Sequence, residues 1–198
     1  MSYELYTPGY LEVFCGPMKS GKTLELIHRV NKLDYRDDID FVFFKPSVDT
    51  RDDKIKSRFS EKTFQCIFLD DPEELFNHLN NELVIAIDEA HFFDKDKLIK
   101  TVNKLLEMDK NVLIAGLDLD FRGEPFGAIP YLLCNADKVY KSYGICDFPG
   151  CNNRARMTQR LVNGEPASYD SPLILVGDAK EGYETRCRDH HKVLKNNE

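Results

Sequence analysis

The chain has 198 residues, of which 42% are hydrophobic and 31% are charged, and its formal net charge is −7. This composition excludes a collagen-like or intrinsically disordered chain, and the length fits one domain with a small appendage. The acidic balance argues against a domain that binds along a nucleic-acid backbone, while small anionic ligands stay compatible with it.

No apolar stretch approaches the roughly 20 residues that cross a bilayer. The first ten residues, MSYELYTPGY, lack the basic and apolar regions of a secretory signal. We therefore expect a cytoplasmic protein, in which the six cysteines are core residues or metal ligands rather than partners in three disulfides. Cys15, Cys66 and Cys134 lie in apolar runs and are expected to be buried.

Apolar runs of strand length alternate with helical patterns along residues 1–142. The expected strands show little polar alternation, as buried parallel strands do. They are residues 10–15, 39–45, 64–69, 83–88, 111–116 and 137–142. Helices are expected at 24–33, from Asp71-Pro72 onward, and at 95–109. This order predicts an α/β fold with a parallel sheet and helices on both faces.

The pattern changes after about residue 143, where cysteines, prolines and an Asn-Gly turn replace the β-α alternation. No crossover helix is expected there. Residues 157–164 and 171–177 are expected to form two short strands joined by a loop. The sequence therefore predicts a larger domain over residues 1–142 and a smaller one over residues 143–198.

The stretch GPMKSGKT, residues 16–23, matches the pattern G-x-x-x-x-G-K-[ST] and lies between an expected strand and an expected helix. Its glycines let successive backbone N–H groups form an anion-binding nest, and the helix N-terminus adds its dipole. Lys22 can reach the β- and γ-phosphates, and Thr23 can ligate Mg²⁺. The stretch predicts a triphosphate-binding loop, with a chance glycine turn as the alternative.

A metal-binding carboxylate is expected in LVIAIDEAHFF, where Asp88 ends an apolar strand and Glu89 follows it. Adjacent side chains on a strand point to opposite sides. Asp88 can therefore face the metal while Glu89 faces a substrate and accepts its proton. An apolar strand that simply ends in an acidic loop is the alternative.

Cys146 and Cys151 are followed, after a long interval, by Cys187 and His190. Three thiolates and one imidazole form a closed tetrahedral set, which is typical of structural Zn²⁺ rather than of a catalytic site. His191 is an alternative fourth ligand. Unpaired core cysteines beside a surface histidine are the alternative to a metal site.

With these features together, the sequence resembles the thymidine kinases of the cellular, zinc-containing type, the type II thymidine kinase family. The motifs that carry the resemblance cover nearly the whole chain and occur in the family's order: GPMKSGKT, KPSVDTR, DEAHFF, GLDLDFRGEPFG, TQRLVNG and YETRCRDHH. The resemblance implies a RecA-like P-loop kinase domain over residues 1–142 and a zinc-bound lasso domain over residues 143–198.

The activity implied by the resemblance is transfer of the ATP γ-phosphate to the 5′-hydroxyl of thymidine or deoxyuridine, giving dTMP and ADP in deoxynucleotide salvage. It also implies a homotetramer and feedback inhibition by dTTP. Glu89 corresponds to the family's general base. The positions that correspond to ATP and Mg²⁺ binding are Gly16, Met18, Lys19, Ser20, Gly21, Lys22, Thr23, Arg51, Asp88 and His91.

A thymine ring needs flat aromatic walls, a small apolar notch for its methyl group, and backbone partners along its polar edge. By resemblance, the aromatic walls are Phe92, Phe121 and Phe126. The methyl notch is formed by Met18, Leu117, Thr158 and Tyr183, and the base edge is read by backbone groups around Leu173, Leu175 and Gly177. Without the resemblance, each phenylalanine is interpreted as plain core packing.

Three features depart from the family pattern. His91 stands where most members have glutamine, and Lys19 replaces the usual Phe or Ala. Four residues separate Cys146 from Cys151, where two are common. None of these departures removes a named catalytic group.

Residues 46–62 carry many charges and little apolar content. We expect a mobile loop that orders over the phosphates when ATP binds, with a solvated linker as the alternative.

Two other functional classes fit parts of the sequence. One is a RecA-like ATPase, which consumes ATP without a nucleoside. The other is a zinc-ribbon binding module with a vestigial loop; the acidic charge and the intact Lys22 and Thr23 argue against it.

Overall fold

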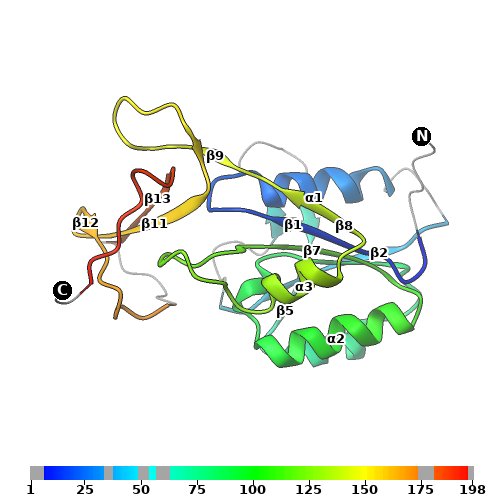
Figure 1. Cartoon of the computed structure of the whole chain (residues 1–198). Helices are drawn as coiled ribbons and strands as arrows, with labels where there is room; N and C mark the ends of the chain where they lie inside the picture. Colours follow the sequence, from blue (N-terminus) through cyan, green and yellow to red (C-terminus); the bar gives the residue numbers. More distant parts are fainter. Residues whose placement is uncertain (1–6, 34–37, 49–53, 57–62, 174–180, 196–198) are drawn as a thin grey trace.

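The computed structural model describes residues 7–33, 38–48, 54–56, 63–173 and 181–195. Its centre is a six-stranded sheet of strands that pair in parallel (Figure 1). The order across the sheet is β5 (Ile67–Leu69), β2 (Phe41–Pro46), β6 (Val84–Ile87), β7 (Asn111–Gly116), β1 (Leu11–Cys15) and β8 (Lys138–Lys141). The predicted α/β class with a parallel sheet is therefore confirmed. Strand β7 lies between β1 and β6.

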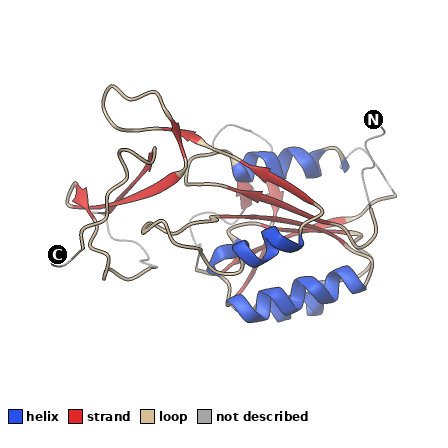
Figure 2. Cartoon of the chain, viewed as in Figure 1, coloured by secondary structure: helices blue, strands red, loops and turns tan. Residues whose placement is uncertain are grey.

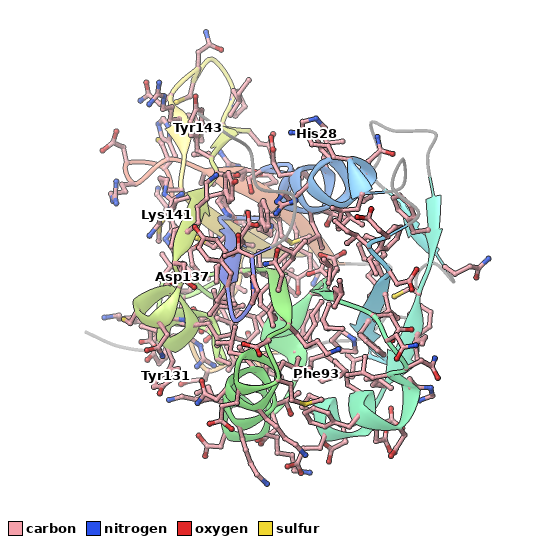
Figure 3. The ribbon with its side chains drawn as sticks, turned by 90° about the vertical axis from the view of Figure 1, so that its right-hand side faces the viewer. His28, Phe93, Tyr131, Asp137, Lys141 and Tyr143 are labelled. Atoms are coloured by element: carbon pink, nitrogen blue, oxygen red, sulfur yellow. The ribbon has the colours of Figure 1, made fainter. Side chains whose placement is uncertain are left out.

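Helices cover both faces of this sheet (Figures 1 and 2). Helix α1 (Lys22–Asn31) packs on one face. The opposite face is covered by α2 (Lys95–Glu107), α3 (Ile129–Asn135) and the 3-10 helix η2 (Pro72–His78). In Figure 3 the sheet is seen between these layers, with His28 of α1 above it and Asp137 and Lys141 along its β8 edge.

The side chains of β1 are apolar except for Glu12, which pairs with Arg29 of α1 at 2.8 Å. Leu11, Val13 and Cys15 are buried in the cluster that includes α2 and α3, while Phe14 is buried in the cluster that includes α1. A strand covered on both faces must be apolar on both faces. The same reasoning applies to β7, whose residues Asn111–Gly116 are all buried.

The expected strand over residues 64–69 is instead two short strands, β4 (Thr63–Gln65) and β5, separated at Cys66. Strand β4 pairs antiparallel with β3 (Lys54–Lys56), outside the central sheet. A strand therefore interrupts the stretch 46–62 that was expected as a loop. Its remaining parts at 49–53 and 57–62, on which the expected mobility depends, lie outside the described residues.

Two helix predictions need correction. The helix that begins after Asp71 is a 3-10 helix, in which the Asp71 side chain accepts the Glu73 N–H at 2.9 Å. Helix α3 was not predicted, because it has only seven residues, too few to show a helical period in the sequence. Among the cysteines expected in the core, Cys15 is buried, but Cys66 is half-buried and Cys134 is exposed.

The chain beyond residue 142 forms small antiparallel sheets at the end of the central sheet where β1 leads into α1 (Figure 1). Strands β9 (Gly144–Ile145) and β10 (Arg154–Ala155) pair, and β11 (Met157–Val162) lies between β12 (Glu165–Pro166) and β13 (Glu181–Arg186). No helix occurs among residues 143–173 and 181–195, as expected.

The first of the two short strands expected in this region is observed as β11. The second, over 171–177, is not observed at residues 171–173, and residues 174–177 lie outside the described chain. The strand that pairs along the full length of β11 is instead β13, which was not predicted.

Within the described part of the chain, no helix is both long enough and apolar enough to span a membrane.

Candidate active site

The loop between β1 and α1 has the backbone that its glycines predict. Gly16 and Gly21 have φ angles of 148° and 85°, in the region that favours glycine. A Cβ atom added to Gly16 would lie only 2.5 Å from the Ser142 carbonyl oxygen, so no larger residue fits there. Lys19 has a φ of 57°, which is uncommon for a residue with a side chain. The loop is a curled turn that leads directly into the N-terminus of α1.

Lys22 and Thr23 begin α1 and face the end of β6. The Lys22 ammonium is buried and donates to the Pro17 carbonyl oxygen at 2.8 Å. The Thr23 hydroxyl lies 3.2 Å from each carboxylate oxygen of Asp88 and donates to that carboxylate. The strands β1 and β6 thus bring together the groups that the sequence placed 65 residues apart.

Asp88 is a buried carboxylate between two ammonium groups. Burial raises the pKa of Asp88, while the charges of Lys45 and Lys22 oppose that rise. Burial in turn lowers the pKa of Lys22, and Glu89 and Asp88 oppose the fall. Hard oxygen ligands such as the Thr23 hydroxyl and the Asp88 carboxylate suit Mg²⁺. The arrangement can hold a divalent cation beside a polyphosphate.

Lys45 was missed by the sequence reasoning. It lies near the end of β2 with its ammonium 3.8 Å from Asp88 Oδ2, and its side chain is 9% exposed. The available signal was a lysine at the end of the apolar run FVFFKP, because a buried strand end rarely keeps a charge without a partner.

Glu89 follows Asp88 and has a left-handed backbone, with a φ of 51°. This conformation is strained for a residue other than glycine and is concentrated at functional sites. The Glu89 side chain is 23% exposed, whereas that of Asp88 is 2% exposed. The two adjacent carboxylates therefore have different environments, one enclosed beside the loop and one open to a ligand.

His91 lies in the 3-10 helix η3 (Ala90–Phe92), which begins directly after Glu89. It is buried, and its Nδ1 atom accepts the backbone N–H of Leu117 at 3.1 Å. A neutral imidazole that accepts at Nδ1 carries its proton on Nε2. Nε2 lies 3.6 Å from Glu89 Oε2, so this N–H faces the carboxylate.

Aromatic side chains extend the site from η3. The rings of Phe92 and Phe126 are 6.2 Å apart and nearly perpendicular, and His91 contacts both, with centroids at 4.1 and 4.9 Å. Leu117 adjoins this group through its hydrogen bond to His91. Three residues predicted for the nucleoside site, Phe92, Phe126 and Leu117, therefore adjoin His91, which was predicted for ATP binding.

Phe121 differs from the other two phenylalanines. It is 5% exposed, and the guanidinium groups of Arg122 and Arg160 each lie 5.3 Å from its ring centroid. The large buried side chain of Arg160, on β11, was also missed by the sequence reasoning. The contacts of Phe121 identify it as a packing partner between the segment after β7 and β11.

The small sheet touches the loop at Met18. The Met18 N–H donates to Thr158 Oγ1, and the Met18 carbonyl accepts from Thr185 Oγ1, both at 3.1 Å. Lys19 forms an ion pair with Asp147 at 3.1 Å. Ser20 is half-buried in the same loop, between Lys19 and Gly21.

Asp118 is a further buried acid that the sequence reasoning missed. It follows β7, is 3% exposed, and pairs with Lys141 at 3.2 Å and with Arg156 at 3.0 Å. The sequence feature that could have identified Asp118 is the one that identified Asp88: an acidic residue at the end of an apolar strand. Arg156 also donates to the Ser142 carbonyl, which adjoins Gly16.

The remaining residues predicted to bind the substrate differ in burial, and some lie outside the described part of the chain. Tyr183 is half-buried on β13, opposite Arg160. Leu173 is 40% exposed, and it is the last described residue before a gap. Arg51, Leu175 and Gly177 lie outside the described residues.

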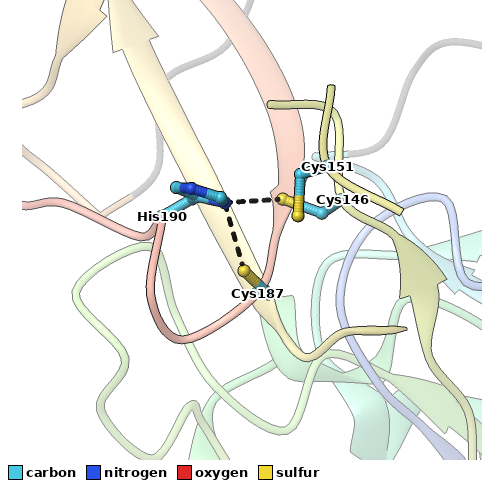
Figure 4. Close-up of side chains that lie close together, drawn as sticks. All are labelled: Cys146, Cys151, Cys187 and His190. Atoms are coloured by element: carbon cyan, nitrogen blue, oxygen red, sulfur yellow. Dashed lines mark hydrogen bonds between the residues drawn. The ribbon is translucent and has the colours of Figure 1, made fainter. Parts of the chain in front are cut away.

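Cys146, Cys151, Cys187 and His190 come together as one cluster, with a ligand atom of each lying within 4.8 Å of the others (Figure 4). His190 Nδ1 lies 3.3 Å from Cys187 Sγ and 3.7 Å from Cys146 Sγ. His191 points elsewhere, with Nε2 at 2.9 Å from the Phe121 carbonyl oxygen. Of the two candidate histidines, His190 therefore belongs to the cluster.

The environment of the cluster favours a thiolate. Burial opposes ionisation of Cys146. Hydrogen bonds from the backbone of Cys187 and Phe148 and with the side chains of His190 and Cys151 together outweigh it, and the pKa of this thiol falls to about 6. The Phe148 ring stacks on His190, with centroids 4.0 Å apart, and so fixes the imidazole plane. A closed set of three sulfurs and one imidazole suggests zinc in a structural role.

Comparison with known proteins gives one family. The family model described as thymidine kinase matches residues 9–191. A protein named thymidine kinase from Coprothermobacter proteolyticus is 45% identical over 186 residues, covering 93% of this chain and 91% of that protein. A thymidine kinase from Mycoplasma genitalium is 47% identical over 189 residues, covering 94% of this chain and 84% of that protein.

Among solved structures, domain III of the Thermotoga maritima replication initiation protein DnaA is similar with a TM-score of 0.40 and 15% identity. That likeness covers 68% of this chain and 55% of the DnaA domain chain.

Proposed function

This chain belongs to the thymidine kinase family, and we propose that it transfers the γ-phosphate of ATP to the 5′-hydroxyl of thymidine or deoxyuridine. The products are ADP and dTMP or dUMP. The observation that carries this proposal is the pair of adjacent carboxylates: Asp88 contacts Thr23 of the loop, and Glu89 beside it is partly exposed.

In this proposal the loop binds the polyphosphate. Backbone N–H groups of residues 19–23 surround the β-phosphate, and Lys22 exchanges its bond with the Pro17 carbonyl for one with a phosphate oxygen. Thr23 and Asp88 would hold Mg²⁺, which would supply positive charge beside the transferred phosphoryl group. Arg51, outside the described residues, is proposed to approach the same group.

Glu89 is proposed to act on the nucleoside. Its carboxylate accepts the proton of the 5′-hydroxyl as the oxygen attacks the γ-phosphorus and ADP leaves. The base is proposed to pack against Phe92 and Phe126, with Leu117, Met18, Thr158 and Tyr183 around its methyl group. The contacts of Phe121 with two guanidinium groups favour a supporting role for it.

The cluster of three cysteines and His190 is proposed to bind structural Zn²⁺. The lasso region, defined as residues 143–198, then forms a second unit whose geometry depends on this metal, and its residues Leu173, Leu175 and Gly177 supply backbone partners for the base. Family membership also supports a homotetramer, inhibition by dTTP and a cytoplasmic location as parts of the proposal.

A panel of nucleosides tests the function directly. Purified protein with Mg-ATP should release ADP only when thymidine or deoxyuridine is present. ADP release without any nucleoside would instead indicate a RecA-like ATPase, and an inert protein that binds nucleic acid would indicate a zinc-ribbon module.

A further inference from the structure

The backbone of Met18 is held on both sides by a pair of threonines. The Met18 N–H donates to Thr158 Oγ1, and the Met18 carbonyl accepts from Thr185 Oγ1, each at 3.1 Å. Thr158 and Thr185 are directly opposite each other on β11 and β13. Both are buried, with exposures of 2% and 1%. One residue of the phosphate-binding loop is thus bound by a cross-strand pair from the lasso region.

A second contact holds the next residue of the loop. The Asp147 carboxylate accepts the Thr185 N–H at 2.8 Å and forms an ion pair with Lys19 at 3.1 Å. Lys19 is the loop residue with the left-handed backbone, which a side chain tolerates only when its surroundings enforce it. The buried threonine contacts of Met18, next to Lys19, help to hold this conformation, while the partly exposed ion pair of Lys19 contributes less.

The position of Thr185 is itself fixed. A Cβ atom on Gly144 would lie 2.8 Å from the Thr185 methyl carbon, so β9 packs directly against this side chain. Thr185 lies two residues before Cys187, and Asp147 follows Cys146. The groups that hold the loop are therefore anchored beside members of the cysteine-histidine cluster.

We propose that Thr185 is a positioning residue for ATP binding: together with Thr158 it fixes Met18, and so sets the geometry of the phosphate-binding loop from the lasso region. This inference rests on the proposed function, because it assigns the loop to ATP. It extends that function by giving a strand outside the central sheet a role in nucleotide affinity.

The test compares Thr185→Val with Thr185→Ser. Valine keeps the shape of the side chain and removes the hydroxyl, while serine keeps the hydroxyl. Loss of one hydrogen bond of ordinary strength should raise the KM for ATP about fivefold in Thr185→Val and leave kcat within about twofold. Thr185→Ser should restore the wild-type KM.

Thr101→Val is the matched control. Thr101 is 1% exposed on α2, and its hydroxyl has no hydrogen-bond partner among the described residues. This variant changes a buried threonine in the same way at a distance from the loop. Its KM for ATP should equal that of the wild type.

A measurement without turnover separates this inference from the proposed function. The Kd for a non-hydrolysable ATP analogue should be about fivefold higher in Thr185→Val than in Thr101→Val. Hydrogen exchange of the Met18 amide should also be faster, because Met18 is then held only through its bond to Thr158. If no nucleoside is phosphorylated, the proposed function fails while these two readouts still test the positioning role.

The side chain of Asp147 is 37% exposed, so Asp147→Ala should fold even if Thr185→Val does not, and it should raise the KM for ATP in the same direction. The proposal is overturned if Thr185→Val and Asp147→Ala both match Thr101→Val in analogue affinity and exchange. It is also overturned if Thr185→Ser is as impaired as Thr185→Val, because the effect then comes from packing.

Discussion

The Thr23 hydroxyl donates to the carboxylate of Asp88, 65 residues further along the chain, at 3.2 Å from each oxygen. This contact joins the first residues of α1 to the end of β6 across the intervening strand β7. It places a hydroxyl and a carboxylate where a cation beside the phosphate-binding loop needs them.

Lys22→Met and Asp88→Asn should each raise the KM for Mg-ATP by about tenfold to a hundredfold, because each removes one charged contact to the phosphates or the cation. Both substitutions keep the volume of the side chain. Steady-state kinetics at varied Mg-ATP check the effect, and thermal unfolding checks the fold. Unchanged kinetics in either variant would contradict the assignment of that residue.

His91→Gln should keep activity within about threefold. The amide oxygen can accept the Leu117 N–H, and the amide nitrogen can face Glu89. His91→Phe should lose at least about tenfold in kcat and should also unfold at lower temperature, because the buried Leu117 N–H then lacks an acceptor. Equal activity in the two variants would show that the polar atoms of His91 have no role.

Zinc content distinguishes the two histidines at the end of the chain. Elemental analysis should find one zinc per chain in the wild type and in His191→Ala, whose side chain faces the Phe121 carbonyl. His190→Ala should lose most of the metal, because it removes one of four ligands. Retention of zinc in His190→Ala and its loss in His191→Ala would reverse the assignment.

Cys187→Ser should lose thymidine phosphorylation far more than ATP affinity. The segment from 143 onward has no helix among its described residues, and ordering such a chain costs about 1–2 kcal/mol per residue for the backbone alone. Without the metal, Thr158 and Tyr183 should leave the nucleoside site. ATP affinity should fall by a smaller factor than phosphorylation, although by more than in Thr185→Val, because Met18 then loses both threonine contacts. Metal-free protein with full thymidine affinity would exclude this role for the cluster.

The sequence predicted the parts of the site that depend on local spacing. Gly16, Gly21 and Lys22 belong to one turn, and Asp88 directly follows an apolar run that predicts a strand. The four side chains predicted to form a metal site lie together in the structure, and His191 lies outside this cluster. These features need only short-range geometry or a known ligand chemistry.

What the sequence could not predict depends on contacts between distant segments. Thr185 and Thr158 meet only because β13 pairs with β11 in one register, and a shift by one residue would turn both side chains to the other face. Lys45 and Asp118 needed the strand order before their partners could be named. Helix α3 was too short to show a period in the sequence.

The most direct test of the proposed function is a single-turnover measurement with ATP labelled at the γ-phosphate, thymidine, and wild-type and Glu89→Gln protein in parallel. The label should appear in dTMP with the wild type. With Glu89→Gln it should appear about 10²–10⁴ times more slowly, because glutamine cannot accept the 5′-hydroxyl proton, while the Kd for thymidine changes less than about twofold. Equal rates for the two proteins would contradict the role of Glu89, and label released as inorganic phosphate without thymidine would contradict the kinase itself.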